Sequence, residues 1–176
     1  MRYYITEEGA VSAMDRGYQN RQQNTQQNTQ RNLPANYLQE LKKGYFSEKK
    51  VIRKEFLITY TNSISLSFVN MTYTQIRSFF GAVRIVESAY HYAIERKSGG
   101  TSEEIAEAKL IANIQRLDGI VTYACARDRN AVPENFRIFL QNNIEACKTA
   151  KDVLEGLIPH FEAVLGYFRY NFPNQR

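Results

Sequence analysis

The sequence predicts an all-α protein: a compact helical bundle of about five helices with a flexible polar N-terminal arm. Three observations lead to this prediction. Apolar residues recur at helical spacing in several long segments, glycines and prolines separate these segments, and only one stretch alternates as a strand does. A lone strand would have no ladder partner for its backbone groups. The 176 residues suffice for one domain with a sizeable core.

The first part of the chain divides into an arm and a short helix. Residues 1–35 contain the tract RQQNTQQNTQRN, whose polar side chains cannot bury enough surface to offset the entropy of ordering. We therefore predict a flexible arm over 1–35 and a single helical-bundle domain over 36–176. The domain begins with a helix over 36–43, which Asn36 can cap and Gly44 ends.

The next predicted helix runs from about Ser47 to Phe68. Ser47 can cap it, and the densest basic run of the chain lies in its first turns. Residues 58–68 alternate apolar side chains with Thr and Ser, as a half-buried strand would. A helix is favoured there as well, because apolar residues also recur at every fourth position: Phe56, Tyr60, Ile64 and Phe68.

The stretch over residues 72–95 is the clearest amphipathic helix. Thr72 and Gln75 have the spacing of a capping box, so the helix is predicted to begin near Tyr73. Its apolar residues form one broad stripe: Ile76, Phe79, Phe80, Val83, Val86, Tyr90 and Ile94. Off this stripe lies a basic row with members about 10 Å apart by the helical rise: Arg77, Arg84 and His91. Such a row is either a solvated face that pairs with neighbouring carboxylates or a binding surface.

A second basic row lies on the next predicted helix, over residues 102–127. Thr101 and Glu104 can cap this helix, and its core face is Leu110, Ile114, Leu117, Val121 and Ala124. Eighteen residues make five turns, so three basic side chains share one azimuth: Lys109, Arg116 and Arg127. Tyr123 lies beside this row, where it could stack on a base or pack at the edge of the core.

Two further helical segments close the domain. Pro133 starts the first, whose core face is Phe136, Phe139, Leu140, Ile144 and Cys147. The second has apolar residues at helical spacing: Leu154, Leu157, Ile158, Phe161, Val164, Leu165 and Phe168. Pro159 is expected to kink this segment or split it in two, and Phe172-Pro173 to end it.

Composition limits the classes of function. The net charge of +5 favours an anionic partner such as nucleic acid. Cys125 and Cys147 lie within apolar helical patterns, and the chain shows neither a signal peptide nor an 18-residue apolar run. We therefore expect reduced, buried thiols in a soluble, cytoplasmic protein with no membrane contact. Only two histidines and no Cys-x-x-Cys are present, so neither a metal nor another cofactor is expected.

Three separated motifs resemble those of one known family. The first is KKGYFSEKKVIRKEF followed by MTYTQIRSFFGAVR, the second is LDGIVTYACARD, and the third is HFEAVLGYFRYNF. In this order and spacing they resemble the small subunit of type III-A CRISPR effector complexes, the Csm small-subunit family. The likeness covers roughly Asn36 to Phe172. The chain departs from the family at Thr59–Ser67, where the family looks plainly helical, and at the final Phe-Pro, where many members end in glycines.

The resemblance implies a non-catalytic, all-helical subunit that associates with itself into a filament or dimer. It implies a place beside the backbone subunits and near the large polymerase-like subunit, in the groove that holds target RNA paired to CRISPR RNA. The family's basic positions fall on Arg77, Arg127 and Arg169. With the basic rows and the basic run, the candidate RNA-binding residues are Arg77, Arg84, Lys109, Arg116, Arg127, Arg169, Lys49, Lys50, Arg53 and Lys54.

These side chains would contact phosphates without regard to sequence, because a guide-directed complex takes its sequence information from base pairing. The basic run over 42–54 could instead meet an acidic neighbouring subunit. A protein-only helical adaptor is the competing function, in which the basic rows are ordinary surface.

An enzymatic function has little support in the sequence. A di-metal helical bundle needs inward Glu-x-x-His pairs, and the sequence contains none. Glu87 and His91 are four residues apart, which is the spacing of an exposed ion pair. Cys125 and Cys147 lie in core patterns rather than near a glycine-rich loop or a strand–turn, so neither suits a nucleophile. We predict that the protein is not an enzyme.

Overall fold

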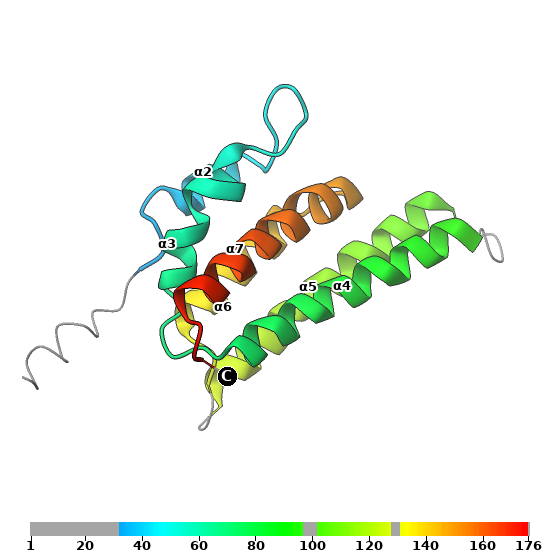
Figure 1. Cartoon of the computed structure of the whole chain (residues 1–176). Coiled ribbons are helices and arrows are strands. Elements are labelled where there is room, and N and C mark those ends of the chain that lie inside the picture. Colours follow the sequence, from blue (N-terminus) through cyan, green and yellow to red (C-terminus); the bar gives the residue numbers. More distant parts are fainter. Residues whose placement is uncertain (1–31, 97–101, 128–130, 176) are drawn as a thin grey trace, which may run out of the picture. The chain divides into compact units, whose positions relative to one another are not determined.

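The computed structural model describes residues 32–96, 102–127 and 131–175, and it confirms the all-α prediction (Figure 1). Over these residues the chain forms six α-helices and no β-strand. The helices are α2 (Tyr37–Lys42), α3 (Thr61–Leu66), α4 (Tyr73–Arg96), α5 (Glu103–Ala126), α6 (Glu134–Ala146) and α7 (Ile158–Asn171). Two π-helical segments, η1 (Glu55–Thr59) and η3 (Asp152–Leu157), precede α3 and α7. Most of the predicted arm, residues 1–31, lies outside the described residues.

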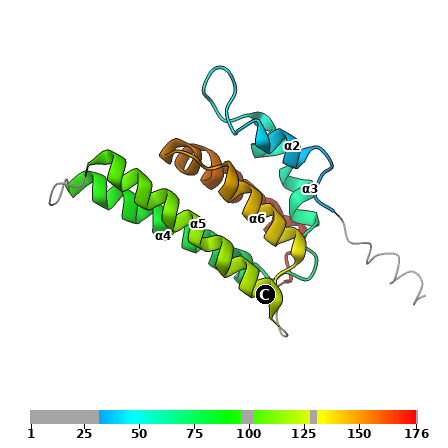
Figure 2. The same cartoon turned by 180° about the vertical axis from the view of Figure 1, so that it is seen from behind.

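The helices of residues 32–175 lie in three layers (Figures 1 and 2). α4 and α5 form an antiparallel hairpin, on which α6 packs against α5 and α7 packs against α4. α2 packs on α6, while η1 and α3 pack on α7. The middle layer is therefore covered from both sides, and six buried aromatic side chains gather around it: Tyr37, Phe56, Phe68, Phe136, Phe139 and Phe161.

The beginning of α4 confirms the predicted capping box. The Thr72 N–H donates to Gln75 Oε1 at 2.8 Å, and the Gln75 N–H donates to Thr72 Oγ1 at 3.2 Å. Of the predicted apolar stripe, Ile76, Phe79 and Val83 are buried, whereas Phe80, Val86, Tyr90 and Ile94 are half-buried. The hairpin diverges from α6 and α7 toward its tip, so the far half of the stripe packs mainly on α5 (Figures 1 and 2).

α5 begins one residue later than expected. Ser102 is its N-cap, and the Ser102 Oγ accepts a hydrogen bond from the Ile105 N–H at 3.3 Å. The predicted cap, Thr101, lies outside the described residues. All five predicted core positions are buried: Leu110, Ile114, Leu117, Val121 and Ala124. The predicted core face of α6 is buried as well: Phe136, Phe139, Leu140, Ile144 and Cys147.

The prediction of a helix from Ser47 is wrong for its first two turns. The chain forms a tight hairpin there, in which the Ser47 N–H donates to the Val51 carbonyl oxygen at 2.9 Å. Phe46 and Ile52 form an isolated antiparallel bridge, and Lys50 adopts a left-handed backbone with φ of 59°. Because a left-handed residue cannot continue an α-helix, regular helix starts only at η1.

Residues 59–67 are helical, as predicted against the strand alternative. η1 extends to Thr59 and α3 covers Thr61–Leu66. Three hydroxyl groups here donate to carbonyl oxygens three residues earlier: Thr61 to Ile58 at 2.9 Å, Ser65 to Asn62 at 2.8 Å and Ser67 to Ile64 at 2.7 Å. These bonds let small polar side chains be buried in the helix, since each hydroxyl finds its partner locally.

The last segment, where the sequence predicts a kink or a split at Pro159, changes helix type just before Pro159 while its backbone stays helical. The chain is π-helical over η3 and becomes α-helical at Ile158. Proline has no N–H to continue the regular ladder, and a wider π turn before it is one way to accommodate that loss. Within η3, Gly156 lies against the ring of Tyr45, where an added Cβ would be 2.5 Å from the nearest ring carbon.

We expect Gly156→Ala to lower the free energy of unfolding by about 1 to 3 kcal/mol, because the new methyl group would overlap a fully buried ring. Urea unfolding followed by circular dichroism measures this loss. Gly166→Ala on α7 is the matched control, because a Cβ there meets no atom within 4 Å. Alanine favours a helix over glycine, so the control should not be destabilised. Equal losses in the two variants would contradict the packing argument.

Candidate nucleic-acid interface

Three basic motifs meet at one end of the bundle. α4 and α5 are antiparallel, so the first turns of α4, with Arg77, lie beside the end of α5, where Arg127 follows (Figure 1). The C-terminal segment reaches the same end, because the Tyr73 N–H donates to the Gln175 carbonyl oxygen at 3.3 Å. Arg169, in the last turn of α7, therefore joins the other two. We call Arg77, Arg127 and Arg169 the arginine pole.

Arg169 is held in place at the arginine pole by α4. Its Cζ lies 5.1 Å from the centroid of the Tyr73 ring, a cation–π contact, and one guanidinium nitrogen donates to the Pro173 carbonyl oxygen at 2.9 Å. The side chain is exposed all the same. A guanidinium carries five N–H donors, so Arg169 is oriented and still has donors for a ligand. Nothing in the local sequence pattern indicates that Tyr73 would position it.

Arg77 and Arg127 are both exposed. Arg77 follows Tyr73 by four residues, so it lies on the same side of α4 one turn later. Within the described residues Arg77 takes part in no ion pair. Arg127 is the C-cap residue of α5 and has an extended backbone with φ −69° and ψ 144°. Its φ is close to the helical value and only its ψ is extended, so the chain leaves the helix immediately after Arg127.

The remaining members of the two rows lie away from this end. Arg84 pairs with Glu87 at 2.7 Å, and His91 Nε2 lies 4.0 Å from the same carboxylate. A carboxylate therefore offsets part of the charge of the row on α4. Lys109 and Arg116 are exposed on α5. Lys109 precedes Arg127 by eighteen residues, which is about 27 Å along the helix axis. The ten candidate residues thus do not form one continuous surface.

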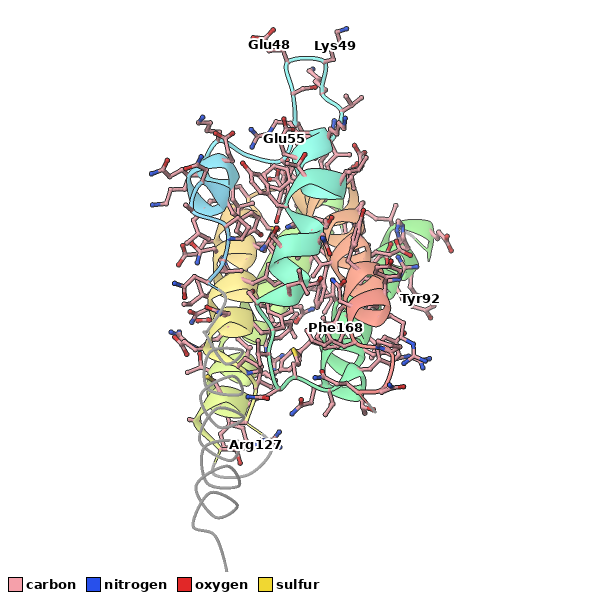
Figure 3. All side chains as sticks on the ribbon, turned by 60° about the vertical axis from the view of Figure 1, so that its left-hand side comes forward. Glu48, Lys49, Glu55, Tyr92, Arg127 and Phe168 are labelled. Atoms are coloured by element: carbon pink, nitrogen blue, oxygen red, sulfur yellow. The ribbon has the colours of Figure 1, made fainter. Side chains whose placement is uncertain are left out.

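The basic run lies at the opposite end of the bundle from Arg127. Figure 3 shows the hairpin with Glu48 and Lys49 at one end and Arg127 at the other. Lys49, Lys50 and Lys54 are exposed. Lys151 docks this hairpin onto the start of η3, because its Nζ donates to the Lys50 carbonyl oxygen at 3.0 Å. These lysines therefore belong to a surface separate from the arginine pole.

Arg53, the fourth candidate of that run, has a structural role. Its guanidinium donates to Glu40 Oε2 at 2.7 Å, to the Gly44 carbonyl oxygen at 2.7 Å and to the Glu40 carbonyl oxygen. It also lies over the Phe56 ring, and its side chain is only 17% exposed. Hydrogen bonds from Lys43 and from Arg53 hold the pKa of Glu40 below its ordinary value. Arg53 thus ties the hairpin to α2.

The two thiols are not prepared for nucleophilic chemistry. Cys147 is buried as predicted, and burial raises its pKa to about 12. Cys125 was expected to be buried but is half-buried, with its Sγ 3.3 Å from Glu134 Oε2. Burial, and then the hydrogen bond to Glu134, raise the pKa of Cys125. A nucleophilic cysteine needs a lowered pKa, so neither environment activates a thiolate. Among the described residues no three His, Cys, Asp or Glu side chains gather so as to hold a metal ion.

Comparison with known proteins assigns the family. The family model described as Csm2 Type III-A matches residues 52–174, a region that contains all three residues of the arginine pole. Searches of curated proteins and of solved structures found no match. None of the described helices is both long and apolar enough to cross a membrane. Because the match covers well over half of the chain, the chain belongs to the Csm2 family, whose members are structural subunits of type III-A CRISPR effector complexes.

Proposed function

We propose that this subunit lines the groove that holds CRISPR RNA paired to target RNA, and that the arginine pole contacts phosphates without reading sequence. The main observation in favour of this proposal is that three arginines from separate motifs meet at one end of the bundle: Arg77, Arg127 and Arg169. The chain has a net charge of +5. Basic residues clustered on one part of a surface are the electrostatic footprint of nucleic-acid binding.

Arginine suits this task for a geometric reason. Its planar guanidinium can hold a phosphate through two parallel hydrogen bonds, and it stays charged at any physiological pH. In a guide-directed complex, base pairing between guide and target carries the sequence information, so the surrounding protein needs to recognise only charge and shape. The contact of Arg169 with Tyr73 supports the proposal, because an oriented guanidinium loses less entropy when a phosphate binds.

The proposed arrangement also includes protein partners. The family associates with other subunits of the effector complex. In the proposal, copies of this subunit stack into a filament or pair as a dimer in the cytoplasm, beside the backbone subunits and near the large polymerase-like subunit. The subunit contributes no catalytic group of its own, which agrees with the raised pKa values of both thiols.

We expect Arg77→Ala and Arg127→Ala each to weaken RNA binding to a similar degree for unrelated sequences. Each lost phosphate contact should also reduce the slope of log affinity against log salt by about 0.7 to 0.9. Fluorescence anisotropy with two unrelated RNAs, single-stranded and paired, between about 50 and 200 mM salt gives both quantities. Lys148→Ala is the matched control, since it removes an exposed positive charge that follows α6 and belongs to none of the candidate residues.

Two results would count against this proposal. Unchanged affinity and salt slope in folded Arg77→Ala and Arg127→Ala proteins would make the arginine pole a solvated surface. An equal loss in Lys148→Ala would mean that the RNA responds only to net charge. Circular dichroism must show that each variant keeps the helical content of the parent.

A further inference from the structure

A stripe of exposed side chains along α5 has a composition that phosphate contact does not explain. Ile105 is 47% exposed, Ile120 is 53% exposed and Tyr123 is 71% exposed. Lys109 and Arg116, also exposed, lie among them. At 100° per residue these five side chains fall within about 60° of azimuth, and they extend along about 27 Å of the helix. We call these five residues the α5 stripe.

The charges of α5 are segregated around the helix axis. Its only acidic residues are Glu103, Glu104, Glu107 and Asp118, and all four lie on other sides of the helix than the α5 stripe. Glu107 is turned toward the start of η3, where its Oε1 accepts a hydrogen bond from the Ala150 N–H. The α5 stripe therefore combines apolar and cationic side chains with no carboxylate of its own helix among them.

The side of α5 that faces the bundle is already fully packed. Its core face, from Ala106 to Ala124, is buried against α4 and α6. About half of the surface of Ile105 and of Ile120 therefore stays outside the packing of this chain. Exposed aliphatic side chains gain free energy only when another apolar surface covers them. A sugar–phosphate strand would satisfy Lys109 and Arg116 but would leave both isoleucines beside a densely charged chain.

We propose that the α5 stripe docks onto another protein subunit of the effector complex, one that presents an apolar ridge flanked by carboxylates. The ridge covers Ile105, Ile120 and the ring of Tyr123, while the carboxylates pair with Lys109 and Arg116. Charge complementarity sets the register of such a contact, and the apolar side chains supply most of its affinity. This inference rests on membership of the complex and does not require that the arginine pole binds RNA.

A second copy of this chain related by a two-fold axis does not suit the α5 stripe. In a two-fold contact the same patch faces itself, so Lys109 and Arg116 would lie opposite the same two cations. Like charges placed opposite one another disfavour an interface. The partner therefore carries the opposite charge. Lys109 and Arg116, which the sequence groups with the RNA-binding candidates, are assigned by this argument to a protein contact.

The test uses the complete effector complex, reconstituted from its subunits with guide RNA. Ile105→Asn combined with Ile120→Asn removes both aliphatic side chains of the α5 stripe without changing any charge. We expect retention of this subunit, measured by native mass spectrometry over a dilution series, to weaken by about tenfold or more. Ile58→Asn on η1 is the matched control, because Ile58 has the same exposed fraction as Ile120, 53%. It should be retained like the parent.

Charge variants test the chemistry of the partner. Lys109→Glu with Arg116→Glu should weaken retention more than Lys109→Gln with Arg116→Gln, because carboxylates on the partner would then be repelled. Equal effects of the two pairs would contradict an acidic partner.

Experiments on the isolated subunit distinguish a protein-docking surface from an RNA-binding or self-association surface. The Ile105→Asn, Ile120→Asn protein should bind RNA and sediment as the parent does. If its RNA affinity falls while retention in the complex is unchanged, the α5 stripe is an RNA surface and the inference is wrong. It is equally wrong if self-association alone changes, or if nothing changes. Failure of the proposed RNA function would appear separately, in the Arg77 and Arg127 variants, which leave the α5 stripe intact.

Discussion

Phe139→Ala is expected to lower the free energy of unfolding by about 3 to 5 kcal/mol, a large share of the stability of a domain of this size. Phe139 is fully buried on α6. Its ring centroid lies 5.5 to 6.2 Å from those of five other rings: Tyr37, Phe68, Phe136, His160 and Phe161. These rings come from α2, the segment after α3, α6 and α7, so the truncation would leave a cavity that no single helix can close by shifting.

Urea unfolding at neutral pH measures this loss, with Phe80→Ala on α4 as the control. Phe80 belongs to the apolar stripe predicted from the sequence, but it is half-buried and contacts only one of the other described rings, that of Phe161 at 5.3 Å. Its truncation should cost roughly half as much. A loss at Phe139 no greater than that at Phe80 would show that the aromatic cluster is not the centre of the core.

A fall in pH from 7 to 5 is expected to lower the free energy of unfolding by about 2 kcal/mol through His160 alone. His160 is fully buried on α7, and burial lowers its pKa from 6.5 to about 4. Its Nδ1 lies 2.5 Å from the Phe56 carbonyl oxygen, and its Nε2 lies 3.0 Å from the Tyr37 hydroxyl. A carbonyl only accepts, so Nδ1 carries the proton and Nε2 accepts from Tyr37.

Hydrogen bonds from Asn143 and Tyr45 hold the Tyr37 hydroxyl as the donor to His160. Asn143 Nδ2 donates to the Tyr37 hydroxyl oxygen at 2.6 Å, and the Tyr45 hydroxyl donates to Asn143 Oδ1 at 2.8 Å. The Tyr37 oxygen already receives this proton and gives its own to the imidazole. If Nε2 of His160 were also protonated, two donors would face each other, because the Tyr37 hydroxyl already donates its proton toward Nε2. The neutral imidazole is therefore the form that fits.

The sign of the effect follows from the two protonation equilibria. In the unfolded chain His160 takes up a proton below its ordinary pKa of 6.5, whereas the folded protein resists until about pH 4. The unfolded state therefore binds more protons in this window. The stabilisation is fully present above pH 6.5 and is lost as the pH falls toward 4. Hydrogen bonds lower the pKa values of Glu40 and Glu134 from their ordinary value of 4.5, so the stabilisation that these carboxylates contribute is lost mainly below pH 5.

Urea unfolding at pH 7 and at pH 5 measures this dependence. His160→Gln should be less stable than the parent at pH 7 but should change much less between the two pH values. His91→Gln, which replaces the exposed histidine of α4, is the control and should keep the parent's behaviour. A parent protein equally stable at both pH values would show that His160 is protonated within the folded core or reached by solvent.

The sequence by itself determined the long helices. The capping box of Thr72 and Gln75 located the start of α4, and apolar spacing identified every buried position predicted on α5. The sequence also predicted that Thr59–Ser67 is helical, and it contains the motifs that resemble the family. These features depend on residues within a few turns of each other. Caps and a period of 3.6 residues act locally, so a contiguous stretch of sequence contains the whole of their signal.

Only the tertiary structure determined which residues from distant segments contact one another. The hairpin after Ser47 replaces two predicted helical turns, and Arg53 holds it through bonds to Glu40 on α2 and to Gly44 just after α2. The ring of Tyr73 positions Arg169, and Tyr37 bonds to His160 across 123 residues. Neither pair lies within the reach of one helical period. Burial and partner identity at such positions depend on how the layers pack, which no local pattern encodes.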